Sequence, residues 1–368
     1  MSLTVVDQGL LGTYAQYTGF KNRIINGAMV IDQRNAGASV TLDNSGNTYP
    51  ADRWGGVKSV AGGGTVTGQQ VSDAPAGFKS SIKITATASA TVSGTDYVRL
   101  QQRIEGYNVA DMGFGASGAS TFTVSFWVKS SLTGTFGGAF ANDAWNRSYP
   151  FTYTINSANT WEQKTVTVAG DTSGTWQTTN LIGLAVYFGL GVGSTYSGTA
   201  GAWASSLYIS ATGATSVIGT LNATWQVTGV QLEKGSTATS FDYRPYGTEL
   251  QLCQRYFQKS FNQTTAPVDG SNTYTVNAGA TNTNECISQA IYFPVIMRTA
   301  PTITFYRPGV IATSGQWSYY DSGWQTPTST LTNNVHDNYF AMYLAKTSSF
   351  TVKAAYFFIG QYIASAEL

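Results

Sequence analysis

Residues able to act as acids, bases or nucleophiles are few in this chain and lie far apart. His336 is the single histidine, and Asp337 follows it in a polar stretch. A Ser-His-Asp triad could use this pair, but no serine stands in the strand–turn–helix setting that exposes a nucleophile. We therefore interpret His336 as a solvent-exposed or interface residue. Cys253 and Cys286 are the two cysteines. With one histidine they do not form a zinc-ligand set, so no metal site is expected from them and both are predicted to be free, buried thiols.

Glycan hydrolysis is the enzymatic activity that the acidic residues leave open. A glycoside hydrolase needs two carboxylates at a fixed separation, and the chain has 19 Asp and Glu residues. Most of the aspartates, however, stand beside Gly, Asn or Ser, which is typical of turns. The sequence therefore predicts a protein that is not an enzyme, with a glycan hydrolase as an alternative.

Aromatic residues among polar ones point more directly to a function, because the C–H face of a sugar ring stacks on an aromatic face. Trp127 lies on the otherwise polar face of its strand, where an outer loop could also cover it. The stretch 316–324 has four aromatic residues, which would equally suit a subunit or domain interface. The stretch 142–149 is a third place. The candidate glycan-binding residues are Trp317, Tyr319, Tyr320, Trp324, Trp127, Trp145 and Tyr149.

Charge is scarce throughout the chain. Only 11% of the residues are charged, the net charge is +1, and residues 172–232 contain no charged residue. Without a basic stripe, nucleic acid is not an expected partner. No apolar run reaches membrane-spanning length, so no membrane insertion is expected. Small, β-branched and aromatic residues favour strands and turns over long helices, so the sequence predicts an all-β fold.

Alternating apolar residues locate the strands. Every second residue from 122 to 128 is Phe or Val, and many short strands of this kind, separated by Gly-rich turns, predict a jelly-roll sandwich of two stacked sheets. In the stretch 225–232 the apolar phase slips by one residue at Gly229. Such a slip predicts a β-bulge.

The chain changes character after Pro245. Thr248 and Gln251 fit a capping box, and helical spacing continues to Phe257. We therefore predict a helix over 248–257 at the start of a second, smaller β-sandwich. The predicted organisation is an N-terminal anchoring segment (1–21), a jelly-roll β-sandwich (22–246) and a C-terminal β-sandwich (247–368).

The N-terminal segment has an apolar stripe with loose helical spacing and little charge. It could pack against its own domain or dock into a partner. The candidate anchoring residues are Leu10, Leu11, Tyr14, Tyr17 and Phe20.

Four segments carry a family resemblance. They are NRIINGAMVIDQRNAG (22–37) with YPADRW (49–54), the block VTGVQLEKG to YFQK (227–259), MRTAPTITFY (297–306) and the terminal SAEL. Together they resemble a family of bacteriophage tail-fibre and virion-surface proteins. The first module also resembles carbohydrate-binding jelly rolls, which open on an Asn-Gly strand, here Asn26-Gly27, and close on a strand placed like 228–232.

The resemblance implies a structural and adhesive role in a virion that is assembled in the host cytoplasm. The expected protein is a homotrimeric tail fibre whose N-terminal segment joins other virion proteins and whose tip binds host-surface polysaccharide. Closed symmetry would bury the uncharged stretch 172–232 between subunits. A head decoration or capsid-surface fibre protein is the alternative, and a plain carbohydrate-binding module is another.

Modules of this kind often hold a structural calcium through acids of the closing strand. Here that strand reads Gly229-Val-Gln-Leu, and Glu233 is the first acid. Calcium needs several oxygen ligands, usually including carboxylates. Backbone carbonyls and Glu233 could supply some of them, but calcium is not the favoured expectation, and no other cofactor is expected.

Overall fold

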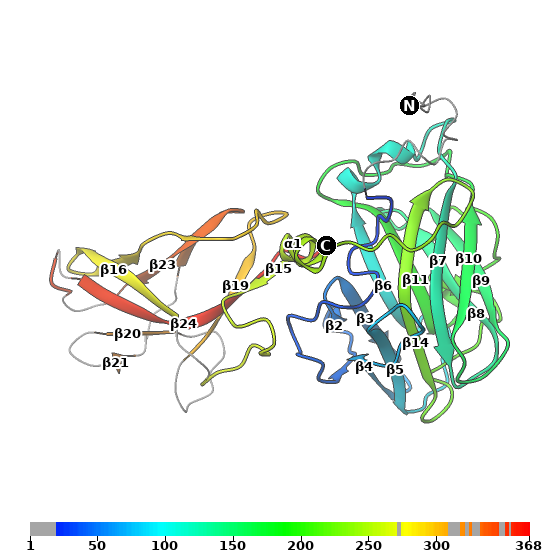
Figure 1. Ribbon diagram of the computed structural model, residues 1–368, viewed down its shortest axis with the longest axis horizontal. Helices are drawn as coiled ribbons and strands as arrows, with labels where there is room; N and C mark the ends of the chain where they lie inside the picture. The colour runs from blue at the N-terminus through cyan, green and yellow to red at the C-terminus, as the bar shows by residue number, and fades with distance from the viewer. Residues whose placement is uncertain are drawn as a thin grey trace, which may run out of the picture.

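The structure, a computed structural model, describes residues 20–270, 274–307, 317–320, 324–325, 332–345, 350–352 and 355–368. Two β-rich units follow one another along the chain, with a short helix between them (Figure 1). The all-β prediction is confirmed. The exact domain boundaries remain a prediction.

The first unit is a sandwich of two six-stranded antiparallel sheets. The first sheet has the order β1 (Val40–Thr41), β4 (Thr65–Val71), β5 (Ser81–Ala88), β14 (Thr224–Lys234), β7 (Phe122–Ser130) and β10 (Glu162–Val168). The second has the order β2 (Thr48–Ala51), β3 (Trp54–Ser59), β6 (Tyr97–Glu105), β11 (Ile182–Val192), β8 (Gly134–Ala141) and β9 (Ser148–Ile155). Two short strands, β12 (Ser197–Gly198) and β13 (Ser210–Ala211), pair in parallel outside these sheets. Three single turns of 3₁₀ helix are η1 (Gly106–Asn108), η2 (Ala110–Met112) and η3 (Ser194–Tyr196).

The core of the sandwich is built from the inward faces of both sheets. The alternating residues of β7 are fully buried, as their pattern predicts. Phe126 from the first sheet lies 5.1 Å, ring centre to ring centre, from Phe188 of the second sheet. Phe188 in turn contacts Trp225 at 5.3 Å. These edge-on and tilted aromatic contacts fix how the two sheets stack.

A β-bulge interrupts β14 where the sequence places it. Thr228 pairs with Trp127 and Gln231 with Ser125, so two residues of β14 stand opposite one of β7. Gly229 has φ +60°, a left-handed conformation that glycine adopts without steric cost. The predicted bulge is therefore confirmed, and it turns the Val230 amide towards the Gly27 carbonyl, 2.9 Å away.

Burial within the fold explains the lack of charge in part of the stretch 172–232. Its two long strands, β11 and β14, are central strands whose residues are almost all buried. The segment between them, residues 193–221, includes η3, β12 and β13, and β13 packs against β8 and β9. Internal burial therefore accounts for the lack of charge in the two strands, whereas many residues of 172–181 and 193–221 are exposed, and the subunit interface stays a prediction.

The helix α1 (Tyr246–Gln254) differs from its prediction at both ends. Pro245 is its N-cap, and the Glu249 amide bonds to the Pro245 carbonyl at 3.0 Å, with no side-chain cap. The predicted capping box is wrong, because proline's fixed φ starts the helix earlier. Phe257 is not helical either, since it begins β15 (Phe257–Lys259) and pairs with Ser365.

The C-terminal unit is one ten-stranded sheet that curls around its own core (Figure 1). Besides β15 it contains β16 (Tyr274–Asn282), β17 (Glu285–Ser288), β18 (Ile291–Tyr292), β19 (Thr302–Tyr306), β20 (Ser318–Tyr320), β21 (Trp324–Gln325), β22 (Thr332–Val335), β23 (Tyr339–Ala345) and β24 (Ala355–Ser365). The long strand β24 pairs with β15, β16, β19 and β20 and so holds the sheet together.

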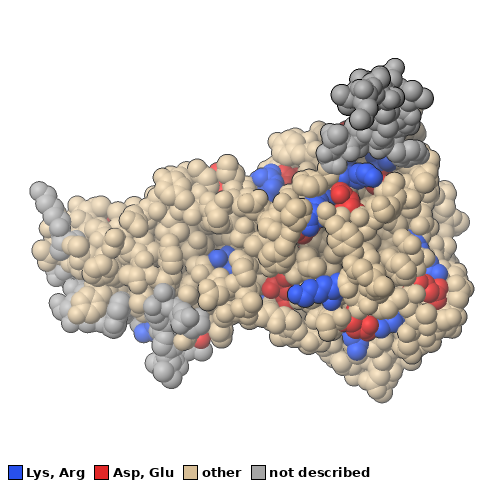
Figure 2. All heavy atoms as spheres, in the orientation of Figure 1, with Lys and Arg blue, Asp and Glu red and all other residues tan. Residues whose placement is uncertain are grey.

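Buried ion pairs join the two units. The chain end returns to the joint beside α1 (Figure 1), where Glu367 pairs with Arg53. Glu105 of β6 accepts hydrogen bonds from Arg255 (2.9 Å) and from the Tyr256 hydroxyl (2.7 Å). Burial alone would raise the pKa of Glu105, but these hydrogen bonds and the nearby positive charge hold it below its usual value. On the face shown in Figure 2, charged side chains lie mainly on the sandwich and the joint, and few lie on the C-terminal unit.

Candidate functional site

The outer face of the second sheet carries a small pocket. Alternation in β6 directs Val98 and Leu100 into the core and leaves Tyr97, Arg99 and Arg103 on the outer face. The pocket measures ≈ 180 Å³ and is lined by Tyr97, Arg99, Arg103, Trp145, Tyr196, Leu207 and Ile209.

A segment of the same chain covers the neighbouring part of this face. The strands β8 and β11 present glycine and alanine outward, and Ile209 is buried against Ala139 and Ala185. A Cβ atom at Gly137 would lie 2.3 Å from the Ser210 hydroxyl oxygen, so only glycine permits this approach. The covering segment therefore limits the open surface to one end of the sheet.

Trp145 is held over the pocket by a strained turn between β8 and β9. Its φ of 56° is unusual for a bulky residue. The Asn142 side-chain oxygen fixes the turn by accepting hydrogen bonds from the amides of Asn146 and Arg147, both at 3.1 Å. The Trp145 ring lies 6.2 Å from the ring of Tyr187. This turn positions an aromatic wall that extended strand geometry alone would not supply.

Two arginines form the polar part of the pocket. The Arg99 guanidinium carbon lies 4.9 Å from the ring centre of Tyr97 and 4.7 Å from that of Tyr187. The Arg103 guanidinium lies 5.4 Å from the Trp145 ring centre, and its Nη1 donates to the Leu368 carbonyl oxygen at 2.8 Å. Burial lowers the pKa of Arg99, and burial raises the pKa of Tyr187 to about 12 despite both arginines. The site thus combines aromatic faces with desolvated N–H donors.

Tyr149 does not join Trp145 in this site. Its ring lies 5.3 Å from that of Trp203, which in turn lies 5.5 Å from Trp176. These aromatic residues pack at the edge of the sandwich core. The two candidates from the stretch 142–149 therefore face different parts of the molecule.

Trp127 is half-buried on the outer face of the first sheet. A Cβ atom at Gly229 would lie 3.1 Å from its Cδ1 atom and 2.6 Å from Cζ of Phe78. Phe78 belongs to an outer loop and packs on Phe241 with ring centres 5.1 Å apart. Trp127 thus lies beside an aromatic cluster that an outer loop supplies.

The candidates of the C-terminal unit lie in different environments. Trp317 is 0% exposed and packs on Phe358 at 4.2 Å, so burial corrects its assignment as a sugar-binding surface residue and gives it a core role. Tyr319 is buried as well, whereas Tyr320 is 43% exposed. Trp324 pairs through its backbone with Tyr320 in β21, and its side chain lies outside the described residues.

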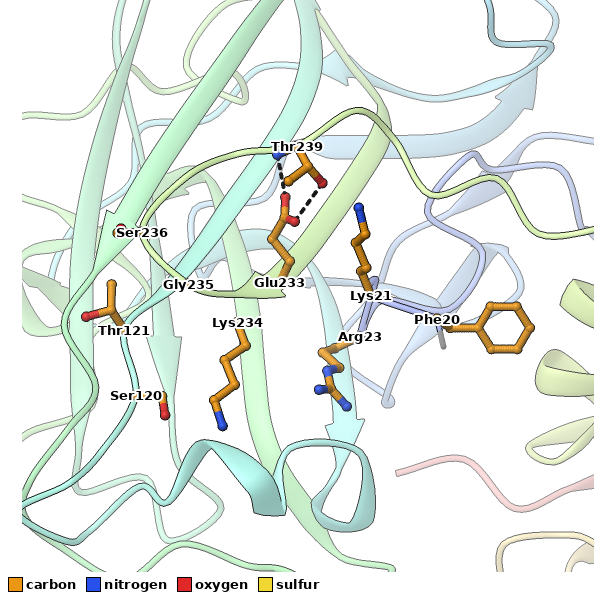
Figure 3. A pocket seen from close by; sticks show the side chains of 10 residues that line it. All are labelled: Phe20, Lys21, Arg23, Ser120, Thr121, Glu233, Lys234, Gly235, Ser236 and Thr239. Atoms are coloured by element: carbon orange, nitrogen blue, oxygen red, sulfur yellow. Dashed lines mark hydrogen bonds between the residues drawn. The ribbon is translucent and has the colours of Figure 1, made fainter. Parts of the chain in front are cut away.

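Of the anchoring candidates, Phe20 alone lies within the described residues, and Leu10, Leu11, Tyr14 and Tyr17 lie outside them. Phe20 is 54% exposed. It borders a larger hollow of ≈ 430 Å³, also lined by Lys21, Arg23 and Lys234 (Figure 3). Asp111 pairs with Arg23 at 2.9 Å and so neutralises part of this positive charge.

Glu233, in the same hollow, is held by hydrogen bonds within the chain. Its carboxylate accepts hydrogen bonds from the Thr239 amide (2.8 Å) and hydroxyl (2.7 Å), drawn as dashed lines in Figure 3. The Gln231 side-chain N–H donates to it at 2.9 Å. These hydrogen bonds occupy carboxylate oxygens that calcium would need as ligands. The described residues contain no group of three or more His, Cys, Asp or Glu suited to a metal.

The histidine and the two cysteines do not lie in the pocket. His336 is exposed and stacks on Tyr339, with ring centres 4.6 Å apart. Cys253 and Cys286 are free and buried, as predicted. Within the described ranges, no helix is long and apolar enough to cross a membrane.

Comparisons with known proteins give distant structural similarities. The CBA120 bacteriophage tailspike protein 4 enzymatically active domain shares 15% identity over 58% of this chain and 21% of that chain, with a TM-score of 0.31. A CBM4 structure shares 17% identity over 57% of this chain and 98% of that chain, with a TM-score of 0.28. A family 11 carbohydrate-binding module of a Clostridium thermocellum cellulase shares 12% identity over 54% and 96%, with a TM-score of 0.29. No family model and no curated protein matches. Similarities this distant carry no argument about function.

Tyr97, Arg99 and Arg103 were not predicted as site residues from the sequence. The alternation of β6 was available as a signal, since Val98, Leu100 and Ile104 mark the inward face. It would have placed the aromatic and basic residues together on the other face of one strand.

Proposed function

We propose that this protein binds a polysaccharide of the host surface through the pocket on the second sheet, as a non-enzymatic adhesion protein of a bacteriophage virion. The observation that carries the glycan-binding part is Trp145, which a strained turn holds beside the pocket lined by Tyr97 and Tyr196. Strain of this kind persists where the surroundings enforce it, and it clusters at functional sites.

The chemistry of the pocket suits a sugar. Aromatic faces pack against the C–H face of a pyranose, while N–H donors bind its oxygens. Trp145 and Tyr97 supply the aromatic faces, and Arg99 and Arg103 supply the N–H donors. A volume of ≈ 180 Å³ is below the roughly 300–1,000 Å³ of drug-sized ligand sites, so the pocket suits one sugar unit of a chain.

The absence of catalytic acids at the pocket supports a binding role over hydrolysis. The described residues that line it include no Asp or Glu, whereas glycoside hydrolysis needs two carboxylates about the scissile bond. Glu105, farther along β6, is engaged by Arg255 and Tyr256 at the joint.

The virion role is supported by the resemblance of residues 22–37, 49–54, 227–259, 297–306 and the terminal SAEL to phage fibre proteins. In this proposal the protein is a homotrimeric tail fibre, and its N-terminal segment joins other virion proteins. Light scattering at low concentration tests the trimer, and a stable monomer would contradict it. Electron micrographs of labelled protein on its particle test the attachment.

A glycan array tests the binding proposal and locates the site. Wild type, Trp145→Ala and Trp324→Ala are compared. Trp161→Ala is the matched control, because Trp161 stands just before β10 of the first sheet and does not line the pocket. We expect Trp145→Ala to weaken binding by about two- to tenfold, since the loss of an aromatic contact is worth roughly 0.5–1.5 kcal/mol. Loss in Trp324→Ala instead would move the site to the C-terminal unit. Binding by none of the proteins would contradict the proposal, and release of reducing ends would favour a hydrolase.

A further inference from the structure

Arg99 is a buried cation without a partner in the described chain. It is 8% exposed, and its Nε atom is buried without a hydrogen bond. Among the described residues, no hydrogen bond or ion pair of the Arg99 side chain is found, while the side chain of every other arginine donates at least one hydrogen bond. Its nearest contacts are the rings of Tyr97 and Tyr187.

This arrangement is energetically unusual. Removing a guanidinium from water is costly unless a carboxylate or several acceptors replace the lost hydration. Elsewhere the chain supplies such partners: Arg147 forms two hydrogen bonds to Asp171, both at 2.6 Å. Arg99 lines a pocket and receives no counterpart from the chain, so water or a ligand in that pocket supplies it.

The surroundings favour an anion. Arg103 adds a second positive charge and has a buried, unpaired Nε atom. The Tyr187 hydroxyl, beside Arg99, is also buried without a partner. Asp143 acts on Tyr187 as well, but less than either arginine does. The unpaired polar atoms recorded at Arg99, Arg103 and Tyr187 therefore all carry a hydrogen that they can donate.

We infer that the pocket recognises an acidic sugar, one that carries a carboxylate, with Arg99 as the residue that binds that carboxylate. The planar guanidinium fork matches a carboxylate with two parallel N–H···O bonds. The Arg99 guanidinium lies against the rings of Tyr97 and Tyr187, and Trp145 supplies the face on which the ring of the sugar packs. The inference rests on the proposed glycan-binding function and narrows it to acidic polysaccharides.

Calorimetric titration with matched sugar pairs tests the inference. The probes are the methyl glycosides of glucuronic, galacturonic and mannuronic acid, each against its neutral parent sugar, with glucose 6-sulfate as a second anion. We expect wild type to bind the carboxylate form of at least one pair about tenfold or more tightly than the neutral form, which corresponds to one charge-assisted hydrogen-bond pair.

Variants of the full chain assign the preference to Arg99. Arg99→Gln should lose the preference for the acidic sugar over its neutral parent, whatever it does to the affinity for the neutral sugar. Arg99→Lys should keep part of the preference, because charge remains without the fork. Arg23→Gln removes an equal charge elsewhere and should change nothing. Thermal unfolding checks that the variants fold.

Each outcome decides between the inference and the proposed function. Equal binding of acidic and neutral sugars by wild type, preference for the sulfate, or an unchanged preference in Arg99→Gln would overturn the inference and leave glycan binding standing. Absence of binding to these probes together with a negative glycan array would overturn both.

Discussion

Replacing Gly229 with alanine probes how closely the bulge of β14 packs under its outer loop. Gly229 has φ +60°, and a left-handed conformation costs an L-residue roughly 1–2 kcal/mol. The new Cβ would lie 2.6 Å from Cζ of Phe78, a contact that forces the ring to move. Phe78 packs on Phe241 and Tyr243 at 5.1 and 5.5 Å. Overpacking of this kind costs roughly 1–3 kcal/mol. We therefore expect a loss of about 2–5 kcal/mol in unfolding free energy.

The matched control is Gly94→Ala. Gly94 has φ +50°, but nothing lies within 4 Å of its virtual Cβ, so this variant measures the backbone cost alone. Urea denaturation followed by tryptophan fluorescence gives both values from the midpoints, provided the slope m is unchanged. In the double variant Gly229→Ala/Phe78→Ala, the second change should cost less than it does alone, because the clash disappears.

Equal losses in Gly229→Ala and Gly94→Ala would refute the reasoning. Such a result would mean that Phe78 does not cover the bulge in solution and that strain in the backbone is the whole effect. Additive behaviour in the double variant would lead to the same conclusion.

Three further outcomes are expected. Glu367→Gln should cost about 3 kcal/mol in urea, because it leaves the buried Arg53 unpaired, whereas Asp111→Asn at an exposed pair should cost under about 1 kcal/mol. Folding lowers the pKa of Glu105, so the carboxylate's contribution to stability is present above its unfolded pKa and is lost as pH falls through the folded value. In thermal melts, the melting temperature should therefore fall less between about pH 5 and 3 in Glu105→Gln than in wild type. Asn142→Ala should weaken glycan binding on the array about tenfold by loosening the turn that carries the pocket tryptophan, and unchanged binding would show that the turn needs no such support.

Local patterns predicted what depends on local geometry. The phase slip at Gly229 predicted the bulge because a strand's side chains alternate with period two wherever one face is buried. The same period predicted the buried face of β7. The helix ends failed because the capping-box pattern competes with Pro245 for the same turn, and tertiary pairing of Phe257 with β24 then ends the helix.

Burial of individual aromatic residues could not be predicted in the same way. Trp317 and Tyr320 stand three residues apart in one aromatic-rich stretch, yet one lies in the core and the other is exposed. Their difference depends on the partner strand, β24, about 40 residues away in sequence, whose curl places Phe358 under Trp317. Composition identifies the stretch as rich in rings but not which ring faces solvent.

Arg99 shows where sequence reasoning reaches its limit and why. Its outward position follows from the alternation of β6. Its burial follows from the segment that contains Tyr196, Leu207 and Ile209, which is distant in sequence and packs on the outer face of the second sheet. Without that segment the arginine would be an ordinary solvated residue of a strand face. With it, the guanidinium is desolvated, and no carboxylate of the described chain pairs with it. The sequence pattern of residues 97–105 does not predict that this partner is missing. A function of Arg99 can therefore be inferred only from the folded structure. The absence of a carboxylate partner in the described chain, rather than the arginine itself, indicates a ligand.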